Sequence, residues 1–113
     1  MSLIYKLLPA SEWRAAQAGG VFKGSGIDLA DGYIHFSTGR QAQETARRYF
    51  AGVEDLMLLT IEADDLGPGL KWEPSRGGDL FPHLYGDLAL DKVLEAKAIA
   101  LDEAGIPVLG TLA

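Results

Sequence analysis

The sequence of 113 residues contains no cysteine. This absence excludes a disulfide scaffold, a thiol nucleophile and any zinc or iron–sulfur site built on thiolates. Two histidines are too few for a closed zinc site, and we expect no bound metal; the alternative is a zinc site that carboxylates complete. No apolar run approaches the ~20 residues of a transmembrane helix, and no basic segment precedes a short apolar one as in a signal peptide. We therefore expect a cytoplasmic protein that does not enter the membrane.

The chain is also poor in basic residues, since ten Lys and Arg stand against sixteen Asp and Glu, a net charge of −6. General nucleic-acid binding depends mostly on phosphate neutralisation, so the acidic balance excludes it. The charge is unevenly distributed: residues 1–50 carry a net +2 and residues 51–113 a net −8. A local anion site in the first half remains compatible with these numbers. The partner we expect is a small anionic molecule, and the sequence identifies no protein partner.

The residues that are present give the composition of an ordinary globular domain, with 48% hydrophobic and 23% charged. We predict a single domain over residues 1–113. Because the predicted strands outnumber the helices and do not alternate with them regularly, we expect an α+β fold with a mixed or antiparallel sheet and two short helices. The strands are expected at 4–8, 33–36, 56–61, 70–73 and 93–100 with a terminal hairpin through 106–109, and the helices begin after Ser11 and Thr38.

The two histidines stand in similar surroundings, at His35 and His83. Residues two apart in an extended chain point to the same face, so Ser37 should lie beside the first and Tyr85 beside the second, with Tyr33 also on the face of His35. An imidazole transfers protons near neutral pH, and a neighbouring hydroxyl can position or share the proton. We interpret His35, His83 and Tyr85 as candidate catalytic residues. The alternative is that each imidazole bonds a backbone carbonyl in a half-buried sheet.

A candidate anion site lies where the strand at 33–36 passes into the second helix. Backbone N–H groups at a helix start favour anions, and Arg40 adds a full positive charge beside Ser37 and Thr38. The alternative is that Thr38 only caps the helix, with Gln41 at capping-box spacing, and that Arg40 is solvated.

The segment 72–78 combines an aromatic residue, an acid, a base and two glycines. Trp72 is suited to stacking on a ring and Arg76 to clamping an oxyanion, while the glycines would let the loop close over a ligand. The alternative is a surface connection in which Trp72 packs on the core. The candidate ligand-binding residues of the chain are Tyr33, Ser37, Thr38, Arg40, Trp72, Glu73 and Arg76.

Four parts of the chain resemble a known family. They are Ile4–Leu7, Asp31–Thr38 with Gln41, Glu44 and Thr45 in the next helix, Trp72–Glu73, and Phe81–Gly86. Together they resemble the small bacterial family filed as domain of unknown function 952, and the similarity covers nearly the whole chain. Members are grouped with the ADP-ribosylation fold of NAD-dependent ADP-ribosyltransferases. The resemblance thus implies an ADP-ribosyltransferase-like fold.

The segment Ile34–Ser37 is also similar to the Val-His-Leu-Ser segment of RNA 2′-phosphotransferases, which share that fold. This similarity implies that His35 would lie against the phosphate or ribose of a substrate, with Thr38 and Arg40 nearby. Transferases of the fold often use a late glutamate near the ribose, and Glu73 and Glu95 are the candidates here. The ligand implied is NAD or another nucleotide, although the phosphotransferases use several arginines of which this sequence offers few.

Three hypotheses about function remain open. The first is an enzyme, resembling an ADP-ribosyltransferase or 2′-phosphotransferase, that acts on a phosphorylated or ADP-ribosyl nucleotide with His35 and His83 in one cleft. The second is a small-ligand binding or regulatory domain without catalysis. The third is a phosphoesterase with two His-x-Ser/Thr motifs, which Ser37 fits and Tyr85 does not. The enzyme hypotheses require folding to bring the two imidazoles into a shared pocket.

Overall fold

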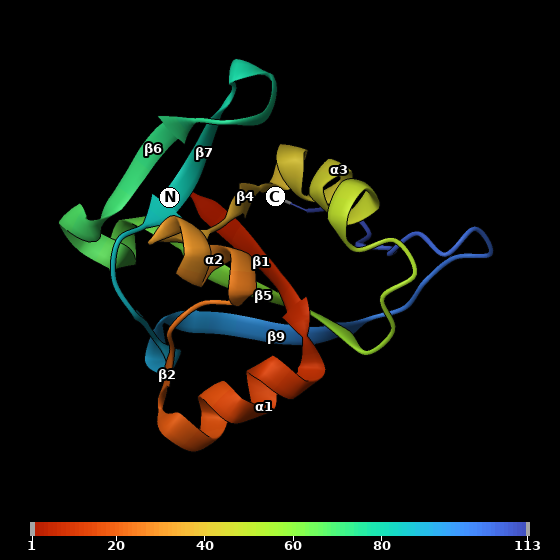
Figure 1. Ribbon diagram of the computed structural model, residues 1–113, viewed down its shortest axis with the longest axis horizontal. Coiled ribbons are helices and arrows are strands. Elements are labelled where there is room, and N and C mark those ends of the chain that lie inside the picture. Colours follow the sequence, from red (N-terminus) through yellow and green to blue (C-terminus); the bar gives the residue numbers. More distant parts are fainter. Residues whose placement is uncertain (1, 113) are drawn as a thin grey trace.

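The computed structural model describes residues 2–112 and shows an α+β fold with antiparallel strand pairs (Figure 1). The larger sheet has the strand order β4-β1-β5-β9. Its members are β4 (Ser37–Thr38), β1 (Leu3–Pro9), β5 (Leu56–Glu62) and β9 (Val93–Ile99). The central strand β5 is buried on both faces, as its continuous apolar run predicts.

A smaller sheet carries both histidines. Its strand order is β3-β7-β6, with β3 (Ile34–His35), β7 (Leu80–Leu84) and β6 (Leu70–Pro74). A further antiparallel pair joins β2 (Val21–Phe22) to β8 (Leu88–Ala89).

The helices cover opposite faces of the larger sheet. Helix α1 (Ala10–Gly19) packs with one cluster of buried residues and α3 (Gly39–Tyr49) with the other. Neighbouring residues of β1 point to opposite faces, so Ile4 contributes to the α1 side and Tyr5 to the α3 side. Short 3₁₀ helices complete the described elements at Ala63–Gly69, Arg76–Gly78 and Leu90–Lys92.

Two details differ from the sequence prediction. Helix α2 (Gly26–Asp31) begins where we expected only a loop, so the fold has one helix more than the two predicted. The strand expected at 33–36 is divided at Phe36, because β3 pairs with β7 whereas β4 pairs with β1. The backbone N–H of Phe36 donates to Pro82 O at 3.0 Å, and the chain crosses from one sheet to the other at this point. Between residues 2 and 112, no helix is long and apolar enough to span a membrane.

Candidate functional site

The fold places the two histidines directly opposite each other. His35 of β3 is the cross-strand partner of His83 in β7, so both side chains point to one face of the smaller sheet. Their ring centroids are 5.3 Å apart. The ring of Tyr33 stacks on His83 with centroids 4.3 Å apart, and it lies 4.6 Å from the ring of His35. The two segments that the sequence singled out therefore form one aromatic cluster.

Both ring nitrogens of His35 face carboxylates. Nδ1 lies 2.6 Å from Asp28 Oδ1, and Nε2 lies 3.0 Å from Asp31 Oδ2. Ionised carboxylates only accept hydrogen bonds, so donation from both nitrogens requires the imidazolium form of the ring. The backbone N–H of His35 donates to Asp28 Oδ1 as well, at 3.0 Å. His35 is thus held between two acids.

Asp28 holds this part of the site together from a buried position, with only 2% of its surface exposed. It is the third residue of α2, where its carboxylate accepts from Ser25 N at 2.8 Å in a capping box, and it also accepts from Lys6 Nζ at 2.8 Å. Burial raises the pKa of Asp28, but hydrogen bonds from His35 and Lys6 outweigh it and lower the pKa to about 2. Burial lowers the pKa of Lys6, against the attraction of Asp28.

His83 is held by an acid on one side only. Its Nδ1 lies 2.8 Å from Glu73 Oε1, and Tyr85 Oη donates to the same oxygen at 2.8 Å. These two hydrogen bonds lower the pKa of Glu73, and the Glu73 carboxylate in turn raises the pKa of Tyr85 to about 12. With Nδ1 donating to an ionised acid, Nε2 of His83 is the nitrogen that can accept a proton from a ligand.

Both histidines line a cleft of about 530 Å³. Arg76 lies in its wall, with the guanidinium 4.9 Å from the ring centroid of Phe81 and one nitrogen donating to Thr45 Oγ1 at 3.3 Å. Ser37 Oγ lies 3.0 Å from the same hydroxyl. The other residues that line the cleft are Tyr5, Lys6, Leu7, Pro9, Glu12, Ser25, Ile27, Asp31, Phe36, Ala42, Tyr49, Phe50 and Ser75.

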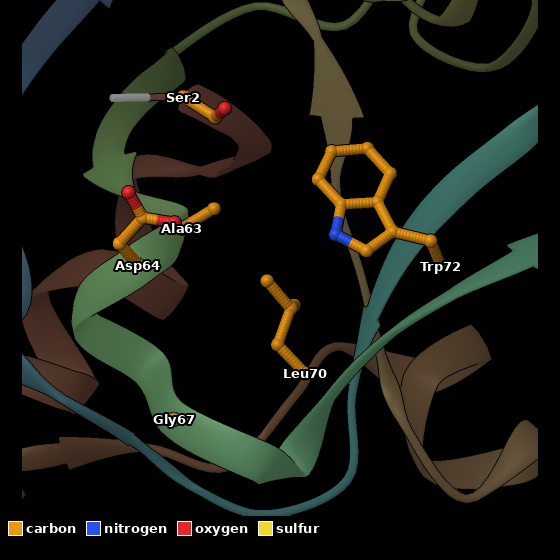
Figure 2. A pocket seen from close by; sticks show the side chains of 6 residues that line it. All are labelled: Ser2, Ala63, Asp64, Gly67, Leu70 and Trp72. Carbon is orange, nitrogen blue, oxygen red and sulfur yellow. The ribbon is translucent and has the colours of Figure 1, made fainter.

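Tyr33 and Glu73 contact the histidines without lining the cleft, and three of the predicted ligand residues lie away from both the cleft and the histidines. Thr38 caps α3 in a capping box with Gln41, and Arg40 is exposed on α3 rather than in the wall of the cleft. Trp72 points to the opposite face of β6 from Glu73, because adjacent residues in a strand alternate. Figure 2 shows Trp72 beside Leu70 in a separate hollow of about 330 Å³. The structure therefore brings Glu73 to the histidines and takes Trp72 away from them.

The sequence analysis did not identify the residues that contact His35, nor Thr45, which accepts a hydrogen bond from Arg76. Asp28 had a detectable signal, because Ser25 and Asp28 have the spacing of a capping box. Lys6 also had one, since a lone charge inside an apolar strand needs a buried partner. Asp31 and Thr45 gave no signal beyond their places in the matching segments. Across residues 2–112, no three His, Asp or Glu side chains are arranged to hold a metal ion.

Solved structures of a bacterial protein have the same fold. The crystal structure of protein CC0527 from Caulobacter crescentus is 54% identical, with a TM-score of 0.95 and a match covering 96% of this chain and 96% of that chain. The solution NMR structure of CC0527 is 55% identical, with a TM-score of 0.88 and coverage of 97% and 95%. Among curated proteins, none matches this chain.

A family model described as protein of unknown function (DUF952) matches residues 7–96. The matched range contains both histidines, the acids that hold them and the arginine in the wall of the cleft. The chain therefore belongs to the DUF952 family of proteins of unknown function.

Proposed function

We propose that the cleft binds a phosphorylated or ADP-ribosyl nucleotide and catalyses group transfer by acid–base chemistry. The observation that carries this proposal is the pair of directly opposed imidazoles, each with its Nδ1 on a carboxylate, at the wall of one cleft. Two imidazoles held in different environments are suited to act as a proton donor and a proton acceptor in one reaction.

The lining of the cleft supports a nucleotide as the ligand class. Arg76 is placed to hold a phosphate, with the hydroxyls of Ser37 and Thr45 beside it. Aromatic side chains such as Tyr49, which is exposed, offer faces for a base, and carboxylates such as Glu12 are acceptors for ribose hydroxyls. The cleft volume lies within the roughly 300–1,000 Å³ of small-molecule sites. The similarity of the Ile34–Ser37 segment to RNA 2′-phosphotransferases supports the same ligand class.

The two histidines take opposite roles in this proposal. His83 Nε2 accepts the proton of an attacking hydroxyl, and Glu73 stabilises the imidazolium that forms. His35 begins as the imidazolium and gives its Nε2 proton to the leaving oxygen. For this step the ligand must displace Asp31, which is partly exposed and accepts from Nε2 at the mouth of the cleft. The proton lost by the attacking group is thus balanced by the proton gained by the leaving group.

A second candidate is a binding domain without catalysis. The observation that favours it is that carboxylates contact both ring nitrogens of His35, which leaves neither nitrogen for a ligand. A ring held in this way can line a binding site without taking part in proton transfer.

Thermal denaturation with NAD, ADP-ribose, a 2′-phosphorylated oligonucleotide and a 2′,3′-cyclic nucleotide tests binding. A ligand at a hundred times its Kd is expected to add about 2.7 kcal/mol to stability and so to raise the midpoint. Arg76→Ala should abolish this rise, whereas the control variant Arg40→Ala, outside the cleft, should retain it. The proposal is wrong if no nucleotide stabilises the wild-type protein.

Chromatography of the reaction products then separates the enzyme from the binding domain. The enzyme hypothesis predicts that His83→Ala keeps the thermal stabilisation but loses product formation by at least about a hundredfold. A nucleotide that stabilises the wild-type protein and is never converted would establish the binding function instead.

A further inference from the structure

The outer edge of strand β9 is exposed along most of its length. β9 is the last strand of the larger sheet and pairs only with β5 among the strands of residues 2–112. Five successive residues, 94–98, are exposed, and Leu94 retains 60% of its surface. In Figure 1 β9 runs across the molecule beside β5, and the segment after it continues beyond the sheet. An exposed strand edge of this length is a template for another strand.

Two charges lie on this strand with no ion pair of their own. Glu95 and Lys97 are exposed, two residues apart, and therefore on the same face of the sheet. Within the described part of the chain neither takes part in a salt bridge or a side-chain hydrogen bond. The opposite face of the strand presents Ala96 and Ala98, which are small and exposed as well. Leu94 is exposed at the irregularity in the pairing with β5, where Ile61 pairs with Val93 and Thr60 with Glu95.

We infer that β9 is a dimerisation edge, which pairs antiparallel with β9 of a second copy of this chain. A two-fold axis perpendicular to the sheet keeps each face on its own side. An axis at Ala96 places Glu95 opposite Lys97 of the partner subunit, and does so twice. Opposite charges directly across an antiparallel pair are stabilising.

The charges select this register over its neighbours. Moving the axis to Glu95 places two carboxylates opposite each other, and moving it to Lys97 does the same with two ammonium groups. Like charges directly across a pair are destabilising, so both of these registers are disfavoured. A lone lysine on a sheet edge would discourage pairing, but a glutamate two residues away makes the edge complementary to itself. The sequence of β9 thus fits its own copy better than an arbitrary strand.

The size of the contact predicts a weak dimer. β9 has seven residues, whereas a standard stable interface uses roughly 20–30 residues a side. We therefore expect association in the micromolar to millimolar range, with a dissociation constant that rises with ionic strength because exposed charge pairs are screened. The cleft with the two histidines is not part of this edge, and the dimer is independent of the proposed function.

Sedimentation velocity over a concentration series tests the inference with exposed charge variants, which leave the core unchanged. Glu95→Lys and Lys97→Glu each make both cross-strand pairs repulsive, and each is expected to raise the dissociation constant about tenfold or more. A mixture of the two variants restores opposite charges at every position and should dimerise like the wild type. The control variant Lys23→Glu carries the same charge change on another exposed segment and should dimerise normally.

Circular dichroism checks that each variant keeps its fold before sedimentation is compared. The inference is overturned if the wild-type chain stays monomeric up to millimolar concentration. It is equally overturned if Lys97→Glu dimerises as well as the wild type, or if the mixture of the two variants fails to associate.

Discussion

The two carboxylate–histidine pairs sit side by side on one sheet, yet they are built differently. Asp28 is buried and tied to a lysine, and it holds His35, whose second nitrogen is held by Asp31. Glu73 lies near the surface and shares one oxygen between His83 and a tyrosine. Carboxylates hold both ring nitrogens of His35, whereas Glu73 holds only Nδ1 of His83 and leaves Nε2 for a ligand. The His-x-hydroxyl pattern therefore occurs twice in the sequence, but His35 and His83 have different environments in the structure.

The largest expected effect is the loss of unfolding free energy when the buried Asp28 carboxylate is neutralised. Asp28→Asn leaves Lys6 buried without a counter-charge, and losing one partner of a buried ion pair costs about 3–5 kcal/mol. Urea unfolding monitored by circular dichroism measures the loss. Asp31→Asn is the matched control, because Asp31 accepts from the same ring at a partly exposed position and should change stability by roughly 0.5 kcal/mol or less.

A second variant separates the ion pair from simple loss of packing. Replacing both charges, Asp28→Asn with Lys6→Met, removes the unpaired ammonium and should recover part of the stability. Equal costs for Asp28→Asn and Asp31→Asn would show that the buried carboxylate has no special role.

The next effect is the pH dependence that the same carboxylate confers. The folded-state pKa of Asp28 is about 2, below the unfolded value of about 4. A lowered folded-state pKa stabilises the protein above the unfolded pKa, and this contribution disappears as the pH falls through the folded pKa. The difference corresponds to about 2–3 kcal/mol, lost between about pH 5 and pH 2. Urea midpoints across this range should fall more steeply for the wild type than for Asp28→Asn, and parallel profiles would contradict the assignment.

The sequence predicts an element of the site only where the element is long enough to show its hydrophobic pattern. The apolar run of β5 is long enough to predict that strand, and the capping-box spacing of Thr38 and Gln41 predicted the start of α3. Helix α2 has six residues, too few for a helical period to show, so the capping-box spacing of Ser25 and Asp28 was its local signal and was not used. Strand alternation predicted the shared face of His83 and Tyr85, and applied to Trp72 and Glu73 it separates them.

The contact between the histidines required information that one sequence does not contain. Alternation gives the face of each side chain, but the register of β3 against β7 is set by packing and turns elsewhere in the chain. The division of the strand at Phe36 had no local signal either, since it arises from pairing with two different sheets. The sequence therefore supplied the reactive residues, and tertiary packing supplied their distance.

The smallest expected effect is a change in the pKa of Tyr85 when the Glu73 charge is removed. The Glu73 carboxylate raises the pKa of Tyr85 to about 12, because ionising the phenol would place a second negative charge beside the first and break its hydrogen bond. Glu73→Gln removes the charge, so the pKa of Tyr85 should fall toward the ordinary value of about 10. A spectrophotometric titration of tyrosinate measures this change, and the same titration of Tyr85→Phe identifies which of the four tyrosines is responsible.

Loss of the Glu73 charge should also affect proton transfer by His83, so the same variant tests the proposed chemistry. Without an ionised acid on Nδ1, the imidazolium form of His83 loses its stabilising partner, so proton transfer at Nε2 is weakened while the cleft keeps its shape. Glu73→Gln is therefore expected to lower turnover of a nucleotide more than its binding. If the pKa of Tyr85 is unchanged in Glu73→Gln, the hydrogen bonds to Glu73 are not formed in solution. The contrast between His83, held at one ring nitrogen, and His35, held at both, would then be wrong.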